Sequence, residues 1–203
     1  MPGRRATEAD RKAQILEGAY RVATQRGLER LTIRRVASEA GLSNGLVHFH
    51  FRTKEALLVA LLDRFLETTT ALRIGDEIAS IASPHERLLA LLRQEMDRLT
   101  RDRRQIQLFF DFWAMGIRHS RVRRRIRGEL DRYREAFRLL AAEVLAAESD
   151  RFPNVSAEGL AAVSVGFIKG CAVQSVIDRD HFDVEEYFAA AMGLMARLET
   201  RAG

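Results

Sequence analysis

Residues 31–55 hold the side chains whose types and spacing best suit chemistry with a polyanion. Their sequence, LTIRRVASEAGLSNGLVHFHFRTKE, predicts two short helices joined by a tight turn. The second helix is polar at its tip, and Arg, His and Lys residues flank it. A helix of this kind enters the major groove of DNA while the flanking cations contact phosphates. The pattern therefore predicts binding to double-stranded DNA.

Three residues indicate where these helices begin and end. Thr32 and Ser43 each precede a predicted helix, where a hydroxyl group caps free backbone amides. Gly41 follows the first helix, and glycine adopts the left-handed conformation that ends many helices. One buried face is expected to hold the two helices at a fixed angle, and its residues are Val36, Ala37, Ala40, Leu42 and Val47.

The tip of the second predicted helix is expected to read the DNA sequence. Gly45 allows the backbone to approach DNA closely, and Asn44 and Val47 are expected to set which bases are preferred. Lys54 lies in the first turn of the next predicted helix, where its ammonium group can meet a phosphate.

The same region resembles the TetR family of bacterial transcriptional regulators. The matching residues are Thr32, the run VASEAGLSNGLVHFHF and Lys54-Glu55-Ala56-Leu57, within a resemblance that covers residues 9–62. This resemblance implies DNA contacts at Thr32, Ser43, Asn44, Gly45, His48, His50 and Lys54. The family usually has Tyr at the position of His48, so an imidazole replaces a phenol here. Val47, Arg34 and Arg35 complete the predicted DNA-binding set. Of these, Arg34 and Arg35 lie outside the buried face of the first helix.

The positive charge of the chain is concentrated in this region. Residues 1–54 hold 11 basic and 5 acidic side chains, a net charge of +6. The rest of the chain holds 22 basic and 23 acidic side chains, a net charge of −1. A basic domain joined to a nearly neutral one suits a polyanionic partner at one end only. A solvated charged surface would explain the number of charges but not their asymmetry.

Helical periodicity continues through the rest of the 203 residues without a convincing strand pattern. The predicted helices lie near residues 9–26, 33–39, 43–50, 54–74, 84–100, 103–116, 119–147, 156–178 and 184–201. The expected fold is all-α with about nine helices, which is also the architecture that the resemblance implies. We expect a three-helix DNA-binding domain with a helix-turn-helix at residues 1–54. A larger helical domain for effector binding and dimerisation is expected at residues 55–203.

The last two predicted helices are expected to form a homodimer interface. Small residues in GLAAVSVGFIKGCAVQSVI permit close helix approach, and the resemblance implies a four-helix bundle made by two chains. Two DNA-binding domains held symmetrically in a dimer also suit two DNA half-sites that lie one helical turn apart. The expected interface residues are Gly166, Phe167, Gly170, Val173, Phe188, Met192 and Met195. The alternative is that these faces pack only within one chain.

The segment QIQLFFDFWAMG gathers aromatic side chains around one acid, Asp111. Such a group can form a cage for a cationic ligand. The FWA run and the later GFIKGCAVQSVID are loosely similar to the choline-responsive BetI subgroup of the family. The candidate effector-binding residues are Phe109, Phe110, Phe112, Trp113 and Tyr133. Because aromatic residues at helical spacing more often form a core, plain packing is the alternative.

Three other patterns do not predict a metal site, a reactive thiol or a second DNA-binding surface. His48 and His50 are two residues apart on a helix and face different ways. No Cys or acidic cluster completes a zinc site, so neither a metal nor a cofactor is expected. Cys171 has no partner for a disulfide within the chain, and its apolar neighbours predict an inert thiol. The arginine-rich run at 118–135 could be a second DNA surface, but we expect a solvated face whose Glu129 and Asp131 pair locally.

The cytoplasm is the expected location. The first residues, MPGRRATEADRK, lack an apolar signal segment, and the longest uncharged apolar stretch, 159–168, is short for a membrane span.

These patterns together predict a DNA-binding transcriptional regulator. The leading hypothesis is a homodimeric repressor that a small-molecule effector releases from a palindromic operator. The alternative is a regulator without such a ligand, which is constitutive or controlled by a protein partner. An enzyme that uses Asp111 and His119 is disfavoured, because no nucleophile motif, phosphate loop or metal set accompanies the pair.

Overall fold

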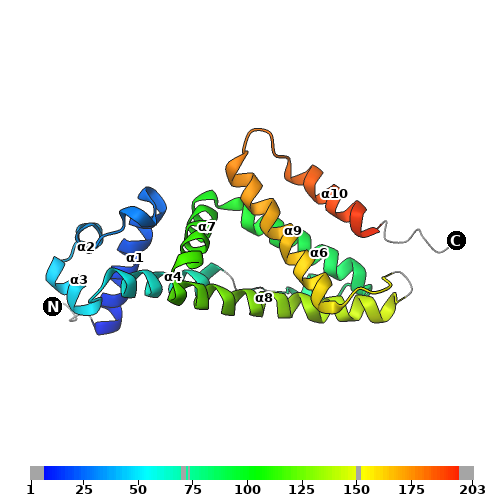
Figure 1. The fold of residues 1–203 in the computed structure, drawn as a ribbon, viewed down its shortest axis with the longest axis horizontal. Coiled ribbons are helices and arrows are strands. Elements are labelled where there is room, and N and C mark those ends of the chain that lie inside the picture. Colours follow the sequence, from blue (N-terminus) through cyan, green and yellow to red (C-terminus); the bar gives the residue numbers. More distant parts are fainter. Residues whose placement is uncertain (1–6, 70–71, 73, 150–151, 197–203) are drawn as a thin grey trace. The chain divides into compact units, whose positions relative to one another are not determined.

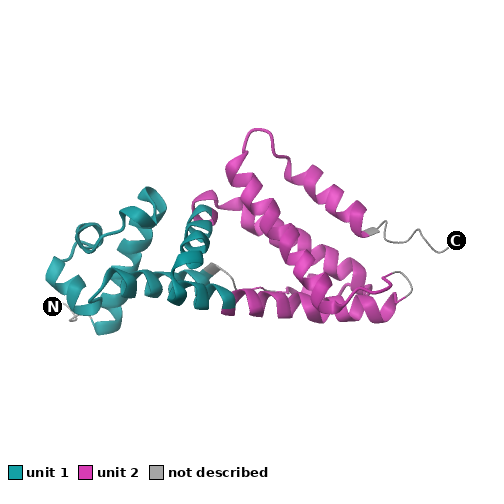
Figure 2. Cartoon of the chain, in the orientation of Figure 1, with its two compact units in different colours: residues 1–71, 107–127 teal, residues 72–106, 128–203 magenta. Residues whose placement is uncertain are grey.

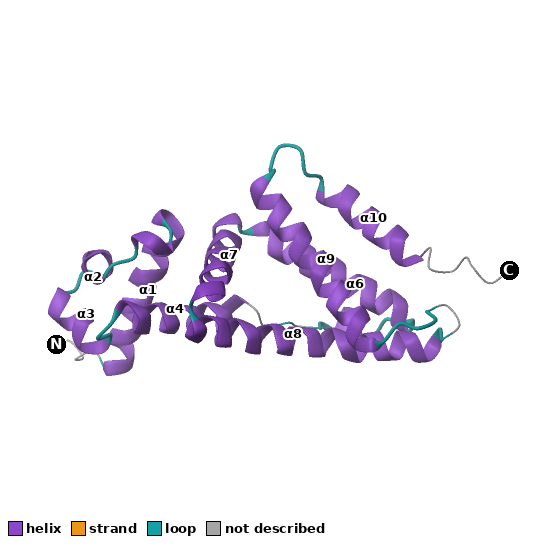
Figure 3. Ribbon diagram, in the orientation of Figure 1, coloured by secondary structure: helices purple, strands orange, loops and turns teal. Residues whose placement is uncertain are grey.

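A computed structural model of the chain describes residues 7–69, 72, 74–149 and 152–196, and within these ranges it contains helices and no strands (Figures 1 and 3). The helices are α1 (Glu8–Arg26), the 3-10 helix η1 (Leu28–Arg30), α2 (Ile33–Ala40), α3 (Asn44–His50), α4 (Lys54–Thr69), α5 (Asp76–Ala79), α6 (Pro84–Arg101), α7 (Arg103–Arg118), α8 (Ser120–Ala147), α9 (Ala157–Ile177) and α10 (Val184–Ala196). The predicted all-α class is confirmed.

The differences from the predicted helices are local. The helix predicted at 54–74 is described to Thr69, and the short α5 and η1 were not predicted. Segments of three or four residues contain no full period of apolar residues, so periodicity gives them no signal. The last residues of the final predicted helix, 197–201, lie outside the described residues, as do 70, 71 and 73.

The chain forms two compact units, which Figure 2 shows in different colours. Unit 1 comprises residues 1–71 and 107–127, and unit 2 comprises residues 72–106 and 128–203. Helices α7 and α8 therefore each contribute residues to both units. The predicted boundary between the DNA-binding domain and the effector-binding domain, at residues 54 and 55, falls within unit 1. This boundary remains a prediction.

In unit 1, a close contact between α1 and α2 fixes the relative position of these two helices. A Cβ added at Gly18 would lie 2.9 Å from the Cβ of Ala40 and 3.1 Å from its backbone nitrogen. Gln14 strengthens the same contact, because its Nε2 donates to the Ala40 carbonyl at 2.8 Å. Further along unit 1, the buried ring of Phe112 in α7 lies 6.3 Å from that of Phe65 in α4. Helix α7 is therefore part of the core of this unit.

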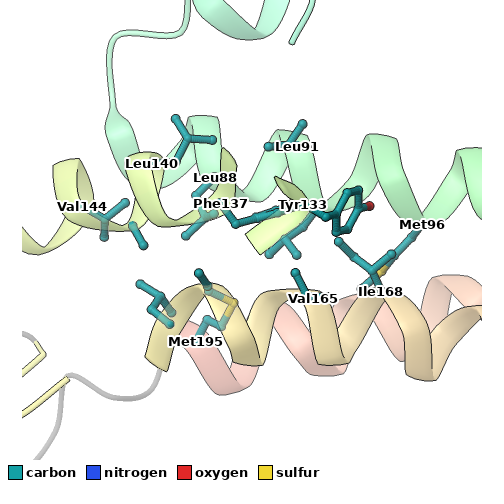
Figure 4. Packing of buried hydrophobic residues seen from close by; sticks show 14 of the residues in the cluster. Leu88, Leu91, Met96, Tyr133, Phe137, Leu140, Val144, Val165, Ile168 and Met195 are labelled. Atoms are coloured by element: carbon teal, nitrogen blue, oxygen red, sulfur yellow. The ribbon is translucent and has the colours of Figure 1, made fainter. Parts of the chain in front are cut away.

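The core of unit 2 is formed mainly by α6, α8 and α9. Figure 4 shows its buried side chains, among them Leu91 of α6, Phe137 of α8 and Ile168 of α9, all at most 2% exposed. Among the described helices, α9 is long and apolar enough to span a membrane by length and composition alone. The sequence analysis considered only the uncharged run 159–168, whereas the whole of α9 also includes Glu158 and Lys169. Packing of α9 against α6 accounts for one apolar side of this helix.

We predict that Gly18→Ala lowers the free energy of unfolding by about 1–3 kcal/mol, because the added methyl group overpacks the α1–α2 contact. This loss exceeds the gain of about 1 kcal/mol in helix propensity. Chemical denaturation measures the change. The control is Gly128→Ala in α8, where a Cβ would meet no atom within 4 Å and stability is expected to rise. Equal stability of Gly18→Ala and the unmodified protein would contradict the proposed role of this contact.

Candidate nucleic-acid interface and a buried polar cluster

The helix-turn-helix forms through the predicted local contacts. The Thr32 hydroxyl accepts a hydrogen bond from the Arg35 amide at 3.2 Å, and the Ser43 hydroxyl accepts one from the Leu46 amide at 3.2 Å. Gly41 ends α2 in the left-handed conformation, with φ of 66°. These caps and this turn confirm the predicted ends of α2 and the predicted start of the second helix.

The exposed side of α3 carries most of the residues of this helix that are predicted to contact DNA. Asn44, Gly45 and His48 are exposed, and His50 is half-buried. A Cβ added at Gly45 would meet no protein atom within 4 Å, so the space beside it is open to a ligand. Val47, in contrast, is 0% exposed and belongs to the core. Its predicted role in base choice disagrees with this burial, because a side chain without exposed surface cannot contact a base.

Phe49 is a functional candidate that the sequence pattern did not reveal. Its side chain is 75% exposed on α3, and its ring makes an edge contact with that of His50 at 5.3 Å. An exposed aromatic side chain on this helix can contact the methyl group of thymine. The signal available in the sequence was helical spacing, because a residue two positions after the inward-facing Val47 points away from the core.

Cationic side chains lie beside these helices. Arg34, Arg35 and Lys54, which are predicted to contact DNA, are all exposed. Arg35 donates to the Arg30 carbonyl at 2.8 Å, and the ammonium group of Lys54 donates to the Glu29 carbonyl at 3.3 Å. Arg35 and Lys54 are thus held against the protein backbone while their side chains remain open to solvent. Such partly ordered cations lose less conformational freedom when they bind a phosphate.

Many arginines of α8 pair with neighbouring acids. Glu129 pairs with Arg132, and Asp131 lies 3.8 Å from Arg134, which agrees with the expected local pairing. Nearer the start of α8, Arg125 binds Asp63 of α4 at 2.9 Å, and Arg121 lies 3.7 Å from Glu55. Within unit 1, α8 is therefore tied to α4 by ion pairs.

The aromatic group of α7 is divided between core and surface. Phe112 is fully buried, whereas Phe109, Phe110 and Trp113 are half-buried and contact one another, with ring centroids 5.3–5.8 Å apart. Burial raises the pKa of the neighbouring Asp111, and the charge of Glu29 raises it further. Residues 109–113 belong to unit 1 and Tyr133 to unit 2, so their joint role in a cage remains a prediction.

Unit 2 contains a buried polar cluster, which we name the Glu95 cluster and define as Glu95, Arg98, Tyr133 and Lys169. Glu95 of α6 is 0% exposed. The guanidinium group of Arg98 donates to both carboxylate oxygens at 2.6–3.1 Å, and the Tyr133 hydroxyl donates at 2.6 Å. Burial is the main cause that raises the pKa of Tyr133, so its hydroxyl keeps the proton that it donates. The paired donors offset the cost of burying the carboxylate.

Lys169 completes this cluster from α9. Its ammonium nitrogen lies 4.9 Å from the centroid of the Tyr133 ring. Burial lowers the pKa of Lys169 to about 8, and the charge of Arg98 acts in the same direction, while Glu95 and Glu129 act in the opposite direction. The sequence pattern missed this cluster, because its members lie on three separate helices.

The other singled-out residues show no further site. Burial raises the pKa of the buried Cys171 thiol to about 11, which makes it a poor nucleophile at neutral pH. In the part of the chain that the structure describes, no three His, Cys, Asp or Glu residues form a group suited to a metal.

Comparison with known proteins agrees with this arrangement. Residues 15–61 match the model of bacterial regulatory proteins of the tetR family, and residues 84–198 match the C-terminal model of BetI-type transcriptional repressors. The transcriptional regulator BetI of Pectobacterium carotovorum is 26% identical over 193 residues, which cover 94% of this chain and 95% of BetI.

Two solved structures share the fold over nearly their whole length. A putative transcriptional regulator of Saccharomonospora viridis in complex with choline has a TM-score of 0.74 at 22% identity, with 94% of this chain and 97% of that chain covered. FadR of Bacillus subtilis in complex with stearoyl-CoA has a TM-score of 0.67 at 17% identity, with 94% and 99% covered. The matched families consist of transcriptional regulators, and no enzyme family is indicated.

We predict that Lys54→Ala weakens binding to all DNA sequences and lowers the slope of log K against log salt concentration by about one. The reason is the loss of one phosphate contact. Fluorescence anisotropy over a salt series measures the slope. Arg132→Ala is the control, since it removes the same charge from unit 2, and an equal slope change there would contradict a specific role for Lys54.

We predict that Gly45→Ala weakens specific DNA binding by about 1–3 kcal/mol, the cost of one poorly matched base pair. The added methyl group meets open space in the protein but obstructs close approach to DNA. Stability is expected to stay equal or to rise by about 1 kcal/mol. DNA titration and thermal unfolding of the same sample separate the two effects. Unchanged affinity would mean that α3 does not approach DNA at Gly45.

Proposed function

Because this chain belongs to the TetR family of bacterial regulatory proteins, we propose that it is a cytoplasmic, homodimeric transcriptional repressor. It occupies a palindromic operator and leaves it when a small molecule binds the C-terminal domain. The observation that carries the DNA-binding role is the exposed side of α3, where Asn44, the open position at Gly45, His48 and Phe49 lie together. The concentration of positive charge in residues 1–54 supports the same role.

Exposed apolar surface on α9 and α10 supports dimerisation. Val163 of α9 is 53% exposed and Leu194 of α10 is 63% exposed. Gly166 and Gly193 have open space where a Cβ would stand, so another helix can approach closely there. A helix such as α9, apolar on its buried side and on its exposed side, favours cover from a second chain.

Some residues expected at the dimer interface have roles within the protomer. Met195 is 5% exposed and lies in the core of unit 2 (Figure 4). A Cβ at Gly170 would lie 2.9 Å from the Tyr187 hydroxyl oxygen, so this glycine allows α10 to approach α9. Phe167 and Phe188 are half-buried, and Phe188 lies under the guanidinium group of Arg93 at 4.9 Å. We therefore place the centre of the proposed interface at Gly166 and Val163, with the half-buried Val173 and Met192 beside it.

Two kinds of ligand in related folds support control by a small molecule. The choline and stearoyl-CoA named for the two solved structures are chemically unlike. The side chains of each chain, and not the fold, must therefore select the effector. In this chain the candidates are the Glu95 cluster and the aromatic group of α7. An effector and the operator then weaken each other's binding by the same factor.

The alternative is a regulator controlled by a protein partner or active without a signal. One observation favours it. The buried polar groups of the Glu95 cluster already bind one another, so this part of unit 2 does not need a ligand to satisfy them. Effector titration against operator-bound protein separates the two proposals.

Selection of bound fragments from random DNA tests the proposed function. We expect a palindromic motif with half-sites about one helical turn apart, because a symmetric dimer presents two copies of α3. Enrichment of DNA without a common motif would contradict operator recognition.

We predict that Val163→Asp converts the dimer to a monomer in sedimentation experiments and abolishes the palindromic preference, because it buries an unpaired charge between two chains. The matched control is Leu139→Asp in α8, where the leucine is 54% exposed, close to the 53% of Val163. The control is expected to remain dimeric. Dissociation of both variants, or of neither, would place the interface elsewhere.

A further inference from the structure

Lys169 places its charge where an aromatic ring attracts cations. The ammonium nitrogen lies 4.9 Å from the centroid of Tyr133, within the distance at which a ring face binds a cation. Tyr133 is only 4% exposed, and Phe137 lies beside it with ring centroids 5.5 Å apart. A cation that belongs to the chain itself therefore occupies a face of this buried ring.

The carboxylate of the cluster is also occupied by the chain itself. Glu95 is fully buried and accepts hydrogen bonds from Arg98 and from the Tyr133 hydroxyl. A ligand cation beside Tyr133 would have to share this carboxylate with the charges of Arg98 and Lys169. Like charges at short distance repel strongly where water is excluded.

We infer that Lys169 is a built-in cation that occupies the cation-binding face of Tyr133 and excludes quaternary ammonium effectors from the Glu95 cluster. This inference rests on the proposed function and narrows it. An effector that reaches the cluster presents an anionic or hydrogen-bond-accepting group to Lys169 instead of a second cation. Lys169 is thus the specificity-determining residue of this site.

The electrostatic surroundings of Lys169 support this assignment. Burial and the charge of Arg98 together outweigh the opposing charges of Glu95 and Glu129, so the surroundings disfavour even the positive charge already present. A further cation would meet the same penalty, whereas an anionic group would relieve it.

The test measures binding of small ammonium ions to the full-length protein without DNA. The probes are tetramethylammonium chloride and n-propylammonium chloride, compared with sodium chloride at equal ionic strength. Thermal unfolding and calorimetric titration are the readouts. The unmodified protein is expected to respond to both ammonium salts as it responds to sodium chloride.

Lys169→Ala is expected to gain ammonium binding. The substitution removes three methylene groups and the ammonium group, and n-propylammonium replaces these atoms. The variant is expected to bind n-propylammonium at least about 10-fold more tightly than the unmodified protein does, the size of a desolvated cation–π contact. Its unfolding temperature then rises with n-propylammonium but not with the neutral n-propanol.

Lys169→Met is the matched control. It fills the same space without a charge, so it is expected to bind neither ammonium ion. Lys169→Ser serves as a second small variant if Lys169→Ala does not fold, as judged by circular dichroism. A folded small variant that gains no ammonium binding would overturn the inference. Binding of tetramethylammonium to the unmodified protein, abolished by Tyr133→Leu, would also overturn it.

These measurements are independent of the test of the proposed function. They use no DNA, so absence of an operator motif would leave the ammonium result intact. Conversely, ammonium binding by the unmodified protein would remove the specificity assigned to Lys169 but would leave operator recognition and dimerisation untouched.

Discussion

The position of α3, the proposed DNA-reading helix, depends on one close approach of two backbones. Helix α1 can lie against Ala40 of α2 only because Gly18 has no side chain, since an added Cβ would come within 3.1 Å of the Ala40 backbone nitrogen. Immediately after Ala40, Gly41 turns the chain in the left-handed conformation and α3 begins. The buried Val47 then holds α3 in the core of the head. The orientation of α3 therefore depends on a close contact at Gly18, a turn at Gly41 and the buried side chain of Val47.

The sequence predicted features that depend on neighbours within four residues. The caps at Thr32 and Ser43 and the turn at Gly41 are of this kind, and all three are confirmed. Phe49 was missed because an apolar side chain suggests a core, whereas helical spacing turns it outward. Glu95 was missed for the opposite reason. It stands among polar residues that suggest a solvated face, and its burial depends on Tyr133 of another helix.

Small residues on α9 show why pattern alone cannot assign an interface. Gly166 and Gly170 are one helical turn apart and give the same signal of close helix approach. In the folded chain, Gly170 meets the Tyr187 hydroxyl of α10, whereas Gly166 has open space. A single helix thus uses one glycine for packing within the protomer, and the other has the open space that the proposed dimer interface requires. Only the register between α9 and α10 distinguishes these roles, and the sequence of either helix alone does not predict that register.

Under the proposed function, α8 connects the effector site in unit 2 with the DNA-binding helices in unit 1. Tyr133 of α8 binds Glu95 in unit 2, and the start of the same helix binds Asp63 of α4 through Arg125 in unit 1. An effector shifts an equilibrium only by its difference in affinity for two states. A ligand that competes for the Tyr133–Glu95 contact has such a difference, because this hydrogen bond is buried and costly to leave unmade. The exposed α8–α4 ion pairs are each worth at most about 1 kcal/mol. The strong Tyr133–Glu95 contact therefore lies in unit 2, where the effector is proposed to bind. The weak ion pairs lie in unit 1, beside the proposed DNA-binding helices. In this arrangement a small ligand can move the DNA-binding helices, because only weak contacts resist the movement.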